Sequence, residues 1–126
     1  MPMTNPTVEL KQRTKQFALR TLAMFRSLPK TEEARIIARQ VLRSATSVAA
    51  NYRAACRARS RAEFAAKIGL VVEEADETVF WMELLAESGI ARTGQISEIL
   101  KEANELLVIF AASQRTVRST SLPMKQ

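Results

Sequence analysis

The stretch RSATSVAANYRAACRARSRAEFAAK, residues 43–67, contains the end of one predicted helix and the start of the next. It is rich in Ala and has no Gly or Pro, which favours helix on both sides. Within it, Ser60 and Glu63 match the S-x-x-E capping box, in which the two side chains satisfy backbone N–H groups at a helix start. The stretch therefore predicts two helices joined by a short corner just before Ser60.

Two more turn signals complete the predicted fold. Pro29 disfavours helix at the residue before it, Thr31 can cap the following helix, and Gly89 suits a left-handed helix end. The chain has 126 residues, 47% of them hydrophobic, with only three Gly and four Pro, which is typical of one domain of long helices. Short connections make sequential helices antiparallel neighbours. We predict an all-α, antiparallel, up-down-up-down four-helix bundle over residues 7–118, with flexible tails at 1–6 and 119–126 and helices at 7–28, 32–57, 61–88 and 95–117.

The composition excludes most catalytic and metal chemistry. The sequence has no His and a single cysteine, Cys56, so it lacks the usual general bases and the Glu-x-x-His pairs of di-metal bundles. Cys56 shares a helical face with Ala45, Ala49 and Tyr52, and we expect it to be a buried, structural side chain. No apolar run approaches the roughly 18 residues of a membrane span. We therefore expect a cytoplasmic, non-enzymatic protein with no cofactor and no metal.

Positive charge is concentrated in the first half of the chain. The net charge is +6, with twelve Lys and Arg against three Glu in residues 1–59, and seven against ten acids in residues 60–126. At 100° per residue, five arginines of the second predicted helix fall within an arc of about 80°. We call these five and the two that follow the arginine edge: Arg35, Arg39, Arg43, Arg53, Arg57, Arg59 and Arg61.

The arginine edge has two interpretations. It predicts a track that binds the phosphates of a nucleic acid, or a face that forms ion pairs with the acids of residues 61–88, within or between subunits. Both interpretations can be correct, each for different arginines of the edge. Beside the edge runs an uncharged polar strip, Gln40, Ser44, Ser47 and Asn51, and we expect Ser47 and Asn51 to have structural roles through internal hydrogen bonds.

The third predicted helix has two apolar strips. One, which includes Phe64, Ile68, Val71 and Val79, has the period of a core stripe. The other lies on nearly the opposite side and predicts an oligomer interface, because one bundle buries one stripe per helix. The alternative is that its tryptophan packs under a neighbouring loop. The members of this second strip are Leu70, Trp81, Leu84 and Leu85.

Several of these segments resemble a bacterial family of four-helix-bundle proteins, the 23S rRNA intervening-sequence proteins. The resemblance covers roughly residues 10–115, and its most specific part is SVAANY followed downstream by E-x-x-E-T-x-x-W. The family usually has Glu where this chain has Ala54, so the centre of this helix is more basic here. The matching residues are Arg43–Tyr52, Ala55, Ser60, Glu63, Phe64, Lys67, Glu73–Thr78, Trp81, Leu84 and Leu85.

The resemblance implies a small cytosolic protein that forms ring-like homo-oligomers, pentamers in known cases. Some members of the family are encoded within insertions of 23S rRNA genes, and related proteins are accessory factors of diversity-generating retroelements that bind nucleic acid and a reverse transcriptase. No enzymatic activity is implied. Together with the arginine edge, this favours a homo-oligomeric bundle that binds RNA or DNA through phosphate contacts. The alternative is a protein-interaction scaffold whose basic edge meets an acidic protein.

Overall fold

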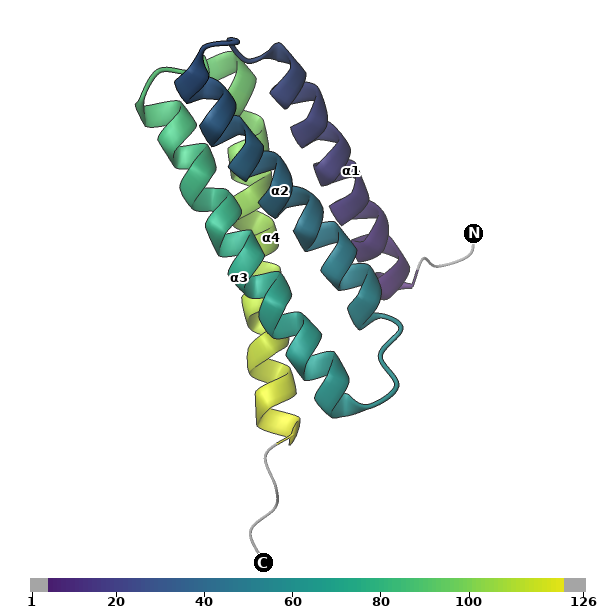
Figure 1. The fold of residues 1–126 in the computed structure, drawn as a ribbon. Helices are drawn as coiled ribbons and strands as arrows, with labels where there is room; N and C mark the ends of the chain where they lie inside the picture. Colours follow the sequence, from purple (N-terminus) through teal and green to yellow (C-terminus); the bar gives the residue numbers. More distant parts are fainter. Residues whose placement is uncertain (1–4, 122–126) are drawn as a thin grey trace, which may run out of the picture.

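The computed structural model describes residues 5–121 and shows four helices in this part of the chain (Figure 1). They are α1 (Pro6–Ser27), α2 (Glu32–Ala55), α3 (Arg61–Glu87) and α4 (Thr93–Ser121), and no residue between 5 and 121 is in a strand. The all-α four-helix prediction is confirmed. Helix α4 continues to residue 121, so residues 119–121 of the predicted C-terminal tail are helical. Residues 1–4 and 122–126 of the predicted tails lie outside the described residues.

The helix ends lie where the turn signals predict them. The Thr31 hydroxyl accepts a hydrogen bond from the Ala34 N–H at the start of α2, and the Ser60 hydroxyl accepts one from the Glu63 N–H at the start of α3. The Glu63 carboxylate accepts in return from the N–H of Arg59, one residue before the position expected for a capping box. Gly89 has φ +80°, the left-handed conformation that ends a helix without strain only at glycine.

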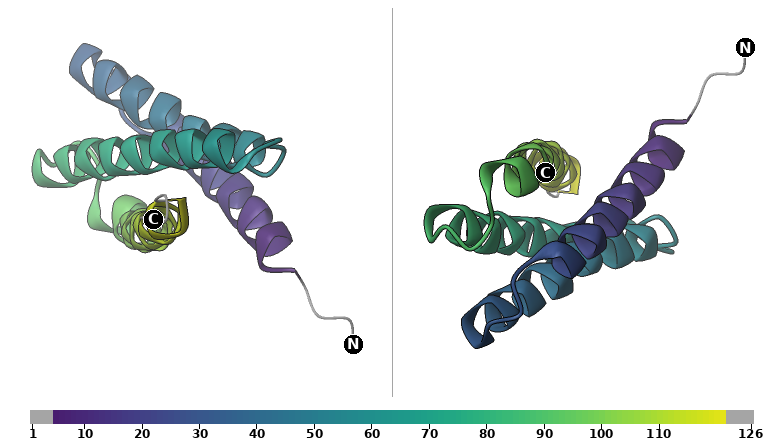
Figure 2. Two further views of the ribbon diagram at one scale, coloured as in Figure 1. Left: turned by 90° about the horizontal axis from the view of Figure 1, so that it is seen from below. Right: turned by 90° about the horizontal axis from the view of Figure 1, so that it is seen from above.

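Consecutive helices run antiparallel and pack side by side (Figures 1 and 2). Helix α2 packs against α1 and α3, and α3 packs against α4. The contact between α1 and α4 is smaller, and the N-terminal end of α1 diverges from the end of α4 (Figure 2). Arg13 of α1 ties the two helices together, because its guanidinium donates to both Glu102 oxygens at 2.7 Å and to Glu105 at 2.8 Å.

The core lies between the helices and draws large apolar side chains from all four. Burial of one such side chain contributes about 1.5–3 kcal/mol to the free energy of folding. The rings of Tyr52 and Phe110 lie 5.1 Å apart at their centroids and join α2 to α4. The apolar side chains with the least exposure are Phe17, Val41, Val48, Ile68, Val71, Met82, Leu85, Leu106 and Phe110.

Cys56 is not inside this core as predicted. Helix α2 ends at Ala55, and Cys56 is the residue that caps it. The side chain is half-buried and packs on the edge of the core, close to Tyr52. Its backbone angles are still helical, with φ −66° and ψ −16°, so Cys56 keeps its place on the apolar face. It is only half-buried because it lies at the end of α2, where fewer side chains cover it.

Candidate nucleic-acid interface

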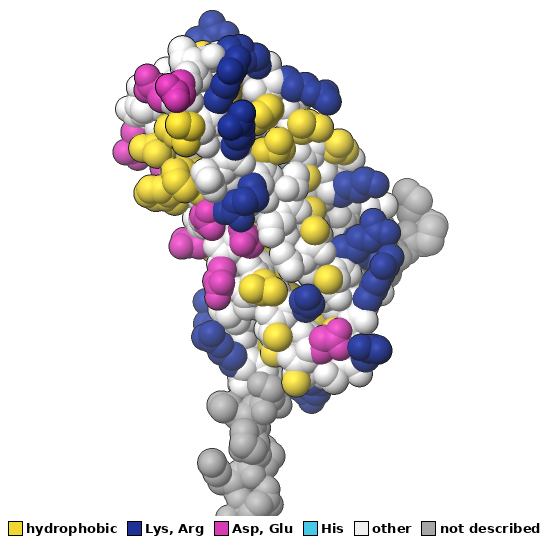
Figure 3. Space-filling model, in the orientation of Figure 1, with side chains coloured by type: hydrophobic (Ala, Val, Ile, Leu, Met, Phe, Trp, Pro, Cys, Tyr) yellow, Lys and Arg dark blue, Asp and Glu magenta, His cyan; other side chains and the backbone are white. Residues whose placement is uncertain are grey.

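The arginine edge is exposed and belongs to a larger basic face. Arg35, Arg39, Arg43 and Arg53 project from α2, and the other three follow at the corner and at the start of α3. Lys and Arg side chains spread over α1 and α2 on the face that Figure 3 shows, whereas Asp and Glu gather mainly toward α3. The uneven charge along the chain is therefore also uneven in space.

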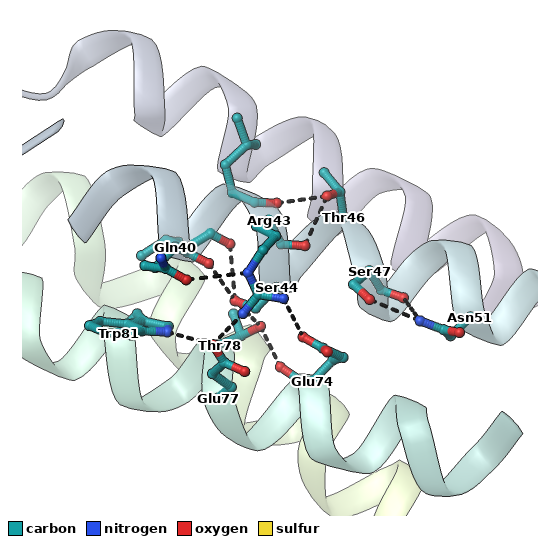
Figure 4. Close-up of polar contacts among 12 residues, drawn as sticks. Gln40, Arg43, Ser44, Thr46, Ser47, Asn51, Glu74, Glu77, Thr78 and Trp81 are labelled. Carbon is teal, nitrogen blue, oxygen red and sulfur yellow. Dashed lines mark hydrogen bonds and ion pairs between the residues drawn. The ribbon is translucent and has the colours of Figure 1, made fainter. Parts of the chain in front are cut away.

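Arg43 is the one member of the edge that is held by two acids. Its guanidinium lies 3.2 Å from Glu74 Oε1, contacts Glu77 as well, and donates through Nε to Gln40 Oε1 at 3.2 Å (Figure 4). The hydrogen bond with Glu77 raises the pKa of Arg43, and the nearby charges of both acids add to this. Arg43 thus joins α2 to α3, which is the ion-pair interpretation of the edge.

The acids that hold Arg43 are linked to further polar groups on α3. Trp81 Nε1 donates to Glu77 Oε2 at 2.9 Å, and this bond and the one from Arg43 lower the pKa of Glu77. One turn away, the Ser44 and Thr78 hydroxyls are buried and 2.9 Å apart (Figure 4). A small hydroxyl pair of this kind lets α2 and α3 approach closely while every buried polar atom keeps a partner.

Ser47 and Asn51 form a bond within α2. Asn51 Nδ2 donates to the Ser47 carbonyl oxygen at 2.9 Å and to the Ser47 hydroxyl at 2.8 Å (Figure 4). These are local bonds from one turn of the helix to the next, and they occupy the amide group that would otherwise be free to meet a ligand.

The other arginines have different surroundings, because the two borders of the 80° arc face different helices. The border with Arg43 faces the acids of α3, whereas the border with Arg53 faces α1. Arg59 has one distant partner, with its Nε 3.8 Å from Glu63 Oε1. Within residues 5–121, no carboxylate forms an ion pair with the side chains of Arg35, Arg39, Arg53, Arg57 or Arg61.

Two lysines of α1 extend the basic face beyond the predicted edge. Lys11 and Lys15 line a groove that also contains Arg53 of α2 and Arg57 of the corner after it. Neither lysine belongs to the predicted arginine edge, although the sequence contains a signal for both. They are four residues apart on the helix that precedes α2, and an antiparallel neighbour places the start of one helix beside the end of the next.

The second apolar strip of α3 needs one correction. Leu70 and Leu84 are 42% and 36% exposed, and Trp81 is half-buried, but Leu85 is 0% exposed and lies in the core. Leu85 is turned 100° from Leu84, which carries it to the border of the core stripe. Phe80, one turn before Leu84, is 53% exposed and packs edge-on against Trp81 with ring centroids 4.9 Å apart. The exposed strip, here called the α3 strip, is Leu70, Phe80, Trp81 and Leu84.

Residues 5–121 contain no candidate metal centre and no membrane span. No group of three or more Cys, Asp or Glu side chains there is arranged to hold a metal ion. No helix in that range is long and apolar enough to cross a membrane.

Comparisons with known proteins agree with the fold. The family model described as 23S rRNA-intervening sequence protein matches residues 7–112. A solved structure from Bacteroides thetaiotaomicron VPI-5482, described as a protein of unknown function from the S23 ribosomal protein family, is 31% identical with a TM-score of 0.76, over 82% of this chain and 96% of that one. No curated protein matches the sequence. The family match spans most of the chain, including the arginine edge and the α3 strip, so this protein belongs to the family of 23S rRNA-intervening sequence proteins.

Proposed function

We propose that this protein is a non-enzymatic homo-oligomer that binds RNA or DNA through phosphate contacts along its basic α1–α2 face. The observation that carries the proposal is the set of exposed arginines on α2 that form no ion pair within residues 5–121. Exposed cations clustered on one face bind a polyanion and release its counterions. Arginine suits this task because its planar fork matches two phosphate oxygens.

The same face favours contacts with the backbone over readout of bases. Phe17, Tyr52 and Phe110 are buried, and Phe64, Phe80 and Trp81 lie on α3. The remaining ring, Phe25 of α1, is half-buried beside Arg35 and Arg39. Proteins that read single strands by sequence usually stack bases on exposed aromatic rings. We therefore expect binding that varies little with sequence.

Assembly is the second part of the proposal. In the α3 strip, Phe80 and Leu84 are exposed one turn apart, and Leu70 is exposed farther along the same side of α3. Exposed apolar side chains on one side of a helix favour a contact with a second copy of the chain. The resemblance to ring-forming proteins implies a pentamer. In a ring, several basic faces would act on one nucleic acid, so weak attraction at each would multiply.

The test is the salt dependence of binding to a mixed-sequence RNA and to its DNA counterpart. We expect wild-type affinity to fall steeply as salt rises. The double variant Arg39→Gln/Arg53→Gln should reduce the slope of log K against log salt by about one unit for each arginine. Lys101→Gln, a loss of positive charge on exposed α4, is the control and should leave the slope unchanged.

Arg43→Gln separates the two interpretations of the edge. Because Arg43 is held by Glu74 and Glu77, this variant should leave the slope unchanged and lower the free energy of unfolding by about 1 kcal/mol. Thermal denaturation of the same samples measures the second effect. If the assembled wild type binds neither RNA nor DNA at low salt, the nucleic-acid proposal is wrong, and a scaffold for an acidic protein takes its place.

A further inference from the structure

A groove of about 550 Å³ lies between the first half of α1 and the second half of α2. Lys11 and Lys15 line it from α1, Arg53 lines it from α2, and Arg57 lines it from the corner that follows α2. Lys11 and Lys15 are four residues apart, so both side chains lie on one face of α1, about 6 Å apart along its axis. The two antiparallel helices and this corner thus place four positive charges around one groove.

The charges of the groove are not balanced by the protein. All four cations are exposed, none forms an ion pair within residues 5–121, and no carboxylate is among the lining residues. Like charges around a cleft focus a positive potential into it and raise the local concentration of anions. The groove therefore favours a ligand with more than one negative charge.

Between the cations the groove is apolar. Val8, Ala49 and Ala50 provide this part, and Gln12 and Thr46 are its uncharged polar members. The two alanines are small, so a ligand can approach the backbone of α2 closely. A ligand that fills the groove needs an apolar or weakly polar body between its charged groups.

We propose that this groove binds one or two unpaired nucleotides of a single-stranded RNA or DNA. The phosphates would lie against the four cations, with the sugar and the base against Val8, Ala49 and Ala50. The inference rests on the proposed function and specifies where on the basic face, and in which form, the nucleic acid binds. The volume is in the range of small-ligand sites, which admit a nucleotide but not a duplex. In a duplex the bases are paired inside the double helix. Its phosphates can reach the cations, but its bases cannot contact the apolar side chains of the groove.

The mixed lining favours a nucleic acid over an acidic peptide as the occupant. In a single strand each phosphate is joined to a sugar and a base, which suits a groove with cations at its sides and apolar side chains between them. No aromatic ring lines the groove, so the preference for unpaired nucleotides should rest on shape and apolar contact, with little dependence on base identity.

The experiment compares an RNA strand of about 20 nucleotides with the same strand annealed to its complement. Binding to the full chain is measured by fluorescence anisotropy at one salt concentration. Ala50→Leu fills the groove and keeps all four charges, and leucine is a good helix former at this exposed position. Ala112→Leu, on an exposed position of α4, is the matched control. Thermal denaturation verifies that both variants are folded.

We expect wild type and Ala112→Leu to bind the single strand about fivefold or more tightly than the duplex. Ala50→Leu should lose this preference while its duplex affinity and salt slope stay as in the wild type. Equal affinity for both forms, or a preference that survives in Ala50→Leu, would overturn the groove proposal and leave the proposed function standing. Failure of the wild type to bind either form would reject both. An oligoglutamate peptide that binds wild type as tightly as the single strand, and is weakened by Ala50→Leu, would assign the groove to an acidic protein instead.

Discussion

Tyr52 shows what a single buried polar group does in this bundle. Its ring packs against Phe110 in the core, and its hydroxyl is close to Cys56 and Thr7. The pKa of Tyr52 is raised to about 12, mainly by burial and also by the neighbouring Cys56 thiol, while the nearby Thr7 side chain opposes the shift. The neutral phenol is therefore the form that the folded protein stabilises.

A pH titration tests this arrangement, because Tyr52 is the only tyrosine in the chain. We expect tyrosinate absorbance to rise with an apparent pKa near 12 in the native protein and near 10 in denaturant. Since the folded pKa is above the unfolded one, the stability from this group is present below pH 10 and is lost between pH 10 and 12. Titration of the native protein near pH 10 would show that the hydroxyl is open to water.

At the scale of the helices, periodicity predicted the existence and order of all four elements. The capping residues Thr31 and Ser60 and the left-handed Gly89 set the corners, because their chemistry is local and visible in sequence. Faces were harder to predict. The pattern predicts Leu85 on the exposed side of α3, but it lies in the core, since a shift of one residue, or 100°, at the border of a stripe exchanges inside and outside.

The arginine edge shows the same limit. A helical wheel places the arginines of the edge together but does not say which helix each border of the edge faces. The ion pairs of Arg43 depend on how α3 packs against α2, and the closeness of Lys11 and Lys15 to the edge depends on how α1 packs against α2. These contacts join residues far apart in sequence, which local patterns do not encode.

Helix α3 offers a matched pair of substitutions that separate assembly from folding. Phe80→Ala removes an exposed ring and should leave the protomer folded while weakening the proposed subunit contact by a few kcal/mol. Leu85→Ala leaves a cavity in the core and should cost about 2–5 kcal/mol of unfolding free energy. Light scattering gives the mass of the assembly, and denaturant melts give the stability. An unchanged assembly in Phe80→Ala would exclude this residue as an anchor of the interface.

The whole molecule has a basic side and an acidic side. The basic side is formed by α1 and α2, and more than half of all acids lie on α3 (Figure 3). Arg43 lies at the boundary, because it joins α2 to the acids of α3. A polyanion is attracted to one side and repelled from the other, so the distribution of charge orients any nucleic acid that approaches. The sequence already contains this asymmetry, because Lys and Arg outnumber acids twelve to three in residues 1–59 and are outnumbered seven to ten in residues 60–126.

The packing order of the helices also bears on how quickly the chain reaches this structure. Each helix packs mainly on its neighbour in sequence, and such local topologies fold rapidly, in microseconds to milliseconds. The pair of Arg13 and Glu102 joins residues 89 positions apart, and we expect it to form after the rate-limiting step.

Arg13→Gln, which lowers the free energy of unfolding by about 1 kcal/mol, should then speed unfolding about fivefold and leave the folding rate unchanged in stopped-flow measurements. A slower folding rate would instead mean that α1 and α4 meet early, so that the closing of the bundle limits the reaction.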